Sequence, residues 1–111
     1  MEKQLGKIES ATFGLCGYQE AMIGINIGIS FGGCGVGYDK SAWDKNIIEH
    51  TKNCKWTEGD RSRDYDAIVR YVSDLLNDAK VRSVSKLVGV PVEVTLENNS
   101  LKSFRILTEV L

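Results

Sequence analysis

The stretch MIGINIGISF, residues 22–31, decides the fold of this chain. Its odd-numbered positions, from Ile23 to Phe31, are isoleucine or phenylalanine, and the even-numbered positions between them are glycine, asparagine or serine. A period of two places the apolar side chains on one face of a β-strand and the small ones on the other. The stretch therefore predicts a strand with one core-forming face and one almost bare face.

The segments on both sides predict antiparallel partners for this strand. Residues 7–15 form a preceding strand, and residues 16–19 form the turn, because Gly17 permits the positive φ of a tight reversal. The glycine pair at 32–33 turns the chain again, with a bulge, into a short strand over residues 34–38. The next segment, residues 39–56, has no sustained period and predicts irregular structure.

A single long helix follows. Thr57 precedes Glu58, Gly59 and Asp60, which is a variant of the capping box with Asp in the third position. Apolar residues then recur at steps of three and four, which predicts a stripe that packs on the sheet. The stripe consists of Tyr65, Ile68, Val69, Val72, Leu75, Leu76 and Ala79.

The end of the chain predicts a short helix and a closing hairpin. Ser83 caps a single turn that ends at Gly89. Residues 90–97 alternate as a strand, residues 98–100 turn, and residues 101–110 return. The order is β-β-β-α-α-β-β, so we predict an α+β fold in which an antiparallel five-stranded sheet carries one long and one short helix.

Composition predicts one soluble domain over residues 1–111. The net charge of −1 disfavours duplex nucleic acid as a partner, since such proteins usually carry a basic excess. No apolar run reaches the roughly 18 to 20 residues that span a bilayer, so we expect no membrane association and a cytoplasmic location. The three cysteines are an odd number and widely spread, which favours reduced thiols.

Motifs for catalysis or metal binding are weak. The glycines of residues 31–37 have the spacing of neither phosphate-binding loop, and we interpret them as a turn. His50, Cys54 and Cys34 do not complete a zinc site, and His50 is the only histidine available as a catalytic base. We therefore predict no enzyme activity, no catalytic residue, no metal and no cofactor.

The bare face of residues 22–31 is a shallow trough that a flat ligand could approach closely; alternatively, the long helix or a second copy of the chain packs on it. Aromatic rings that stack on a base and arginines that pair with phosphate are typical of nucleotide pockets. If Phe104 packs under the helix, Arg105 points to the opposite face, where it could also pair with Glu93 or Glu97. The candidate ligand-binding residues are Tyr18, Asn26, Tyr38, Trp43 and Arg105.

Several short motifs resemble a widespread group of small bacteriophage and prophage proteins. The matching motifs, spread over nearly the whole chain, are Phe13-Gly14, residues 17–22, 35–37, 54–58, 78–81, 91–95 and 101–105. The predicted architecture is also similar to the phage anti-Thoeris sponges. That similarity implies a homo-oligomer that sequesters a cyclic ADP-ribose signal or a cyclic oligonucleotide without cleaving it.

Two function classes remain. The first is a non-enzymatic phage counter-defence protein in the host cytoplasm that sequesters a cyclic nucleotide immune signal. The second is a protein–protein inhibitor that binds a host defence factor, such as a CRISPR effector, through a sheet edge or the segment around Trp43. A small hydrolase is a third, disfavoured class. Recovery of intact bound nucleotide separates the first class from the other two.

Overall fold

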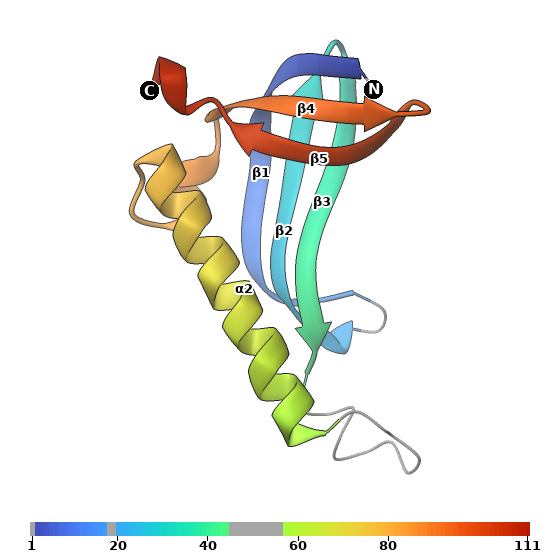
Figure 1. Cartoon of the computed structure of the whole chain (residues 1–111), viewed down its shortest axis with the longest axis vertical. Coiled ribbons are helices and arrows are strands. Elements are labelled where there is room, and N and C mark those ends of the chain that lie inside the picture. The colour runs from blue at the N-terminus through green and yellow to red at the C-terminus, as the bar shows by residue number, and fades with distance from the viewer. Residues whose placement is uncertain (1, 18–19, 45–56) are drawn as a thin grey trace.

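The structure, a computed structural model, describes residues 2–17, 20–44 and 57–111. In chain order the elements are β1 (Glu2–Cys16), β2 (Met22–Phe31), β3 (Cys34–Trp43), α2 (Glu58–Ala79), the 3-10 turn η2 (Val84–Leu87), β4 (Pro91–Glu97), β5 (Ser100–Ile106) and the 3-10 turn η3 (Thr108–Val110). The strands form one antiparallel five-stranded sheet in the order β3-β2-β1-β4-β5 (Figure 1). The predicted α+β class is confirmed.

Two strand boundaries and one hairpin turn differ from the sequence prediction, because pairing between strands overrides the local sequence pattern. β1 begins at Glu2 instead of residue 7, since its first half pairs with β4. β3 continues to Trp43, five residues past Tyr38, because this extension remains paired with the start of β2. The hairpin turn at Gly32 and Gly33 has positive φ at both positions, and the β2–β3 register continues from Phe31 to Cys34 without the predicted bulge.

The C-terminal region also departs from prediction. The predicted short helix is the single 3-10 turn η2, and the Ser83 side chain makes no capping hydrogen bond. The Ser83 hydroxyl instead lies 3.2 Å from that of Ser85. β5 ends at Ile106, and the backbone then turns into η3, so Thr108 is no longer part of the strand.

The sheet curls because β1 pairs with β4 along its first part and with β2 along the rest. Residues 2–7 of β1 pair with β4, whereas residues 7–16 pair with β2, and a register shift lies between Ile8 and Ser10. In Figure 1, β4 and β5 consequently cross the direction of β1, β2 and β3. Gly6 lies at this bend, where a Cβ would come within 2.5 Å of the Ser30 carbonyl oxygen.

The concave face of the curled sheet holds the core. Its least exposed side chains come from β1, β2, β4 and η2, and they are Ile8, Ile25, Ile27, Ile29, Leu87, Val92 and Val94. The predicted apolar face of β2 is thus confirmed at its three central isoleucines. The alternate residues of β2, Gly24, Asn26, Gly28 and Ser30, are small or polar and lie on the convex face.

Helix α2 packs mainly against β3. Thr57 forms the predicted capping box: its hydroxyl accepts from the Asp60 N–H at 3.1 Å, and its own N–H donates to the Asp60 carboxylate at 3.0 Å. Ile68, Leu75 and Ala79 are the buried residues of the helix. The predicted apolar stripe wrongly includes Val69, which is 63% exposed. The neighbouring Ile68 faces the sheet instead.

The bare face of β2 is partly filled from within the chain. A Cβ on Gly24 would lie 2.2 Å from the Lys40 carbonyl oxygen, and one on Gly28 would lie 2.4 Å from the Ser10 hydroxyl. Neighbouring strands therefore use the space that these glycines leave. The trough expected from the sequence is narrower than its residue types indicate.

Candidate functional site

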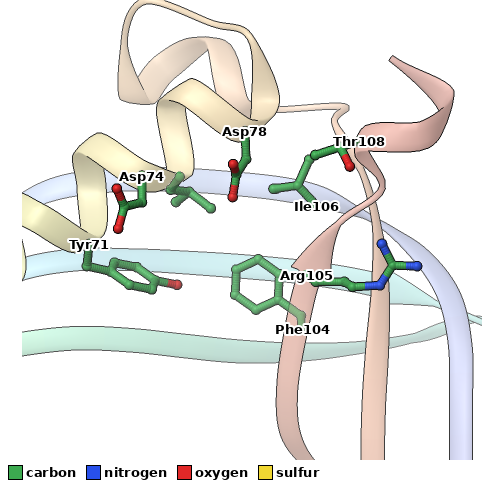
Figure 2. A pocket seen from close by; sticks show the side chains of 8 residues that line it. Tyr71, Asp74, Asp78, Phe104, Arg105, Ile106 and Thr108 are labelled. Atoms are coloured by element: carbon green, nitrogen blue, oxygen red, sulfur yellow. The ribbon is translucent and has the colours of Figure 1, made fainter.

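The candidate site is a pocket between the C-terminal half of α2 and the end of β5 (Figure 2). Its volume is about 390 Å³, within the range of roughly 300 to 1,000 Å³ typical of small-molecule sites. The lining residues come from α2, β5 and η3, and they are Tyr71, Asp74, Leu75, Asp78, Phe104, Arg105, Ile106 and Thr108.

Aromatic rings form one end of this pocket. The Tyr71 ring is stacked near Tyr38, with centroids 6.2 Å apart and an interplanar angle of 29°. Tyr38 in turn meets Phe104 edge to face, with centroids 5.2 Å apart. Burial raises the pKa of Tyr71 to about 12, and the adjacent Tyr38 contributes to the shift. This neutral, rigid surface offers a π face to a planar ligand.

Two carboxylates form the helical wall. Asp74 and Asp78 are four residues apart on α2, so they lie one turn apart on the same side of the helix. Figure 2 shows both side chains on the α2 side of the pocket, across from the strand that carries Phe104 and Ile106. Carboxylate oxygens accept hydrogen bonds from amino, imino or hydroxyl groups. This wall therefore suits the base or sugar of a nucleotide and repels its phosphates.

Arg105 contributes its side-chain stem to the pocket, and its guanidinium points away from the aspartates (Figure 2). The guanidinium forms a bidentate pair with Glu109, both N···O distances being 3.0 Å, and Nε donates to Glu93 at 3.1 Å. Hydrogen bonds to Glu109 and then Glu93 raise the pKa of Arg105, and the same contact lowers the pKa of Glu109. Of the two glutamates proposed as structural partners of Arg105, the structure pairs it with Glu93.

The predicted ligand-binding residues do not gather at one place within the described chain. Tyr38 contacts the lining rings of Tyr71 and Phe104 without lining the pocket itself, and Arg105 is one of the lining residues. Asn26 and Trp43 lie on the convex face, because they alternate with the core-facing Ile25 and Ala42. Tyr18 lies outside the described residues.

Sequence reasoning did not identify Tyr71, Asp74, Asp78, Phe104 or Thr108 as site residues. The helical spacing of 71, 74 and 78 was the available signal, since it places an aromatic ring and two carboxylates on one side of α2. No residue pattern indicated that β5 would lie opposite this side of α2. That juxtaposition depends on the curl of the sheet.

No metal site appears among the described residues, where no group of three His, Cys, Asp or Glu side chains lies close enough to hold an ion. His50 and Cys54 lie outside those residues. Cys16 and Cys34 are free thiols. No described helix has both the length and the apolar character needed to cross a bilayer.

No family model, curated protein or solved structure matches the chain.

Proposed function

We propose that this protein is a phage counter-defence protein that binds and sequesters a cyclic nucleotide immune signal without cleaving it. The ligand class is a cyclic ADP-ribose or a cyclic oligonucleotide. The observation that carries the proposal is the pocket beside α2, which combines aromatic rings and hydrogen-bond acceptors in a volume of about 390 Å³. The motif resemblance to small phage proteins supports the biological setting, the host cytoplasm.

The pocket favours the base and ribose of such a ligand. A base that stacks on the Tyr71 or Phe104 ring gains roughly 1–3 kcal/mol, the usual value for base–aromatic stacking. The carboxylates of Asp74 and Asp78 then accept hydrogen bonds from an amino group or from ribose hydroxyls, and the Thr108 hydroxyl adds a donor. These contacts recognise a nucleoside.

The phosphates lie toward Arg105 in this proposal. Glu109 meets the guanidinium through two parallel hydrogen bonds, the same geometry that a phosphate uses. The Glu109 side chain is 56% exposed to solvent. A phosphate can therefore replace it at small cost in stability. The bound ligand then spans from the aromatic rings to the convex side of the β4–β5 hairpin.

We further propose that the binding unit is a homo-oligomer. Asn26 and Trp43 lie on the opposite face from Tyr38, so within one chain they do not line the same pocket. They would contact the ligand only if a second copy carried them to it. An assembly of copies is therefore part of the proposed function, and it is consistent with the near-zero net charge of −1.

The decisive experiment is a calorimetric titration of the purified protein with a panel of cyclic nucleotides, with linear mononucleotides as controls. Each bound ligand is then released by denaturation and analysed by mass spectrometry. We expect stoichiometric binding of one cyclic class and recovery of intact ligand. Binding of none of the panel would contradict the proposal, and recovery of hydrolysed ligand would identify an enzyme.

Two exposed apolar side chains favour a second candidate function, inhibition of a host defence protein such as a CRISPR effector. Phe13 and Leu15 lie on the concave face of β1, yet they are 48% and 57% exposed. Neighbouring exposed apolar side chains are typical of protein interfaces. Replacement of both by Ser would abolish inhibition in this alternative and leave nucleotide binding unchanged.

A further inference from the structure

β3 is one edge of the sheet, and within the described residues it pairs with β2 alone. It runs for ten residues, Cys34–Trp43, in unbroken register. A strand of this kind leaves alternate backbone N–H and C=O groups on its free side without a ladder partner. Another extended backbone can bind such groups through main-chain hydrogen bonds and so add a strand to the sheet.

The other edge strand, β5, has a register shift that β3 lacks, and its two charged residues are both basic, whereas those of β3 have opposite signs. Its pairing with β4 contains a register shift between Thr95 and Leu96, and its exposed side chains include Lys102 and Arg105. Bulges and charged side chains are the usual means by which proteins prevent edge-to-edge pairing. β3 has no register shift and no proline, and its only charged residues are Asp39 and Lys40.

Two glycines on the convex side of β3 have no explanation within the described chain. A Cβ on Gly35 or Gly37 would find its nearest atom at 3.9 or 4.0 Å, and neither residue has positive φ. Glycine weakens a strand by roughly 0.5–1 kcal/mol relative to alanine. Glycine in a strand often marks the close approach of another backbone. Both residues are exposed and lie beside the free edge.

We propose that two copies of this chain pair their β3 strands antiparallel about a two-fold axis, joining the two sheets into one. This inference rests on the homo-oligomer of the proposed function and assigns one of its interfaces, which leaves Asn26 and Trp43 of both copies on the convex side. A two-fold axis perpendicular to the sheet makes the new ladder antiparallel, the more stable arrangement, and keeps convex faces on the same side. It satisfies the free backbone groups on both copies at once.

Charge and register favour a second copy over an unrelated strand. The edge carries one acidic and one basic side chain, so it shows no preference for a charged peptide. Of the registers that pair about seven or more residues of each β3, two avoid like charges directly opposite each other: Gly37 faces Gly37 of the partner subunit, or Tyr38 faces the partner's Tyr38. In both registers Asp39 and Lys40 lie opposite uncharged residues.

Disulfide trapping tests the interface and its register. In a Cys16→Ser/Cys54→Ser background, the native Cys34 faces position 40 of the partner in the first register and position 42 in the second. Opposed Cβ atoms about 4.5–5.5 Å apart can approach disulfide distance. We expect Lys40→Cys or Ala42→Cys to give a covalent dimer on mild oxidation. Ser103→Cys on β5 is the matched control and should not.

A charge test gives an independent readout. The double variant Gly35→Asp/Gly37→Asp places like charges opposite each other in both registers, and we expect the dimer dissociation constant to rise at least about tenfold. The uncharged isosteres Gly35→Asn/Gly37→Asn are the control, and they should assemble more tightly than the Asp pair. Analytical ultracentrifugation measures assembly, and thermal melting confirms that both variants fold.

Two outcomes would overturn the proposal. One is a wild-type protein that stays monomeric at high concentration. The other is an oligomer that neither cysteine variant traps and that the Asp pair leaves intact, which would place the interface elsewhere. Nucleotide titration of the same samples separates this result from the proposed function, because ligand binding by an oligomer without β3 pairing refutes the interface alone.

Discussion

The rings of Tyr38 and Phe104 meet edge to face, with centroids 5.2 Å apart and an angle of 81° between their planes. Tyr38 lies on β3 and Phe104 on β5, which are the two edge strands of the sheet. The contact therefore joins the sheet across its concave side, and Tyr71 of α2 packs beside it. Tyr71 and Phe104 also line the candidate pocket, so folding and the proposed ligand binding involve the same rings.

Replacement of Phe104 by Ala should destabilise the protein by about 3 kcal/mol, near the lower end of the range for core Phe to Ala changes. The loss combines apolar burial with the edge-to-face contact to Tyr38. Urea unfolding measures it. Phe13→Ala is the matched control; since Phe13 is 48% exposed, its cost should stay below about 1 kcal/mol. Equal losses in the two variants would contradict the assigned role of Phe104.

Tyr71 makes the folded protein sensitive to alkaline pH. Its folded pKa is about 12, above the value of about 10 for an unfolded tyrosine. A raised pKa of this acid means that its contribution to stability is complete below about pH 10 and is lost as the pH rises toward the folded value. Thermal melting across this window should show a decline that is smaller in Tyr71→Phe. An identical decline in both proteins would disprove the assignment.

Substitution of Arg105 by Ala should weaken nucleotide binding about ten- to a hundredfold, because a bidentate phosphate contact is lost. Stability should change by no more than about 1 kcal/mol, since the Arg105 side chain is 50% exposed in its pairs with Glu93 and Glu109. Calorimetry and thermal melting measure the two effects. Arg70→Ala, which removes an exposed pair with Asp66, is the control and should bind normally. Unchanged binding by a folded Arg105→Ala protein would remove Arg105 from the site.

Glu109→Gln should have the opposite effect on binding. The neutral amide competes less well than a carboxylate for the Arg105 guanidinium, so the guanidinium is freed for a phosphate. We expect tighter binding of the same cyclic nucleotide, with an affinity gain that decreases as salt is added. A loss of affinity would indicate that Glu109 itself contacts the ligand or positions Arg105.

The two helix caps differ in strength. Thr57→Ala should cost about 0.5–2 kcal/mol, because the Thr57 hydroxyl satisfies the Asp60 N–H at the start of α2. Ser83→Ala should have almost no effect, since Ser83 makes no capping bond. Hydrogen bonds from Thr57 also lower the pKa of Asp60, so the stability from this contact is present above the usual pKa of the carboxyl and is lost as the pH falls. Urea midpoints of both variants at neutral and acidic pH check this.

Gly24→Ala should destabilise the sheet by about 1–3 kcal/mol, the usual cost of overpacking. Its Cβ would lie 2.2 Å from a backbone oxygen of β3, which cannot move without breaking the ladder. Gly14→Ala is the control, because a Cβ there meets nothing within 4 Å and the residue has no positive φ. Denaturant unfolding measures both variants. If Gly24→Ala were as stable as Gly14→Ala, β2 and β3 would be able to move apart at this point, and the expected clash would be contradicted.

Local sequence determined the elements that depend on contacts between near neighbours. The alternation in residues 22–31 fixed the two faces of β2, and the Thr57–Asp60 box fixed the start of α2. The α+β class followed, because a strand meander and an amphipathic helix have few ways to bury their apolar faces together. The turn at Gly32 and Gly33 was also visible in the sequence, since glycine tolerates positive φ.

The tertiary structure alone decided the curl of the sheet and, with it, the site. β1 reaches β4 through its first six residues, whose sequence shows no strand period strong enough to predict this pairing. The resulting bend brings Phe104 to Tyr38 and Tyr71 and places β5 opposite Asp74 and Asp78. Residues this far apart in the chain meet only when all the strands are paired, so period and spacing could not reveal which of them would share a pocket.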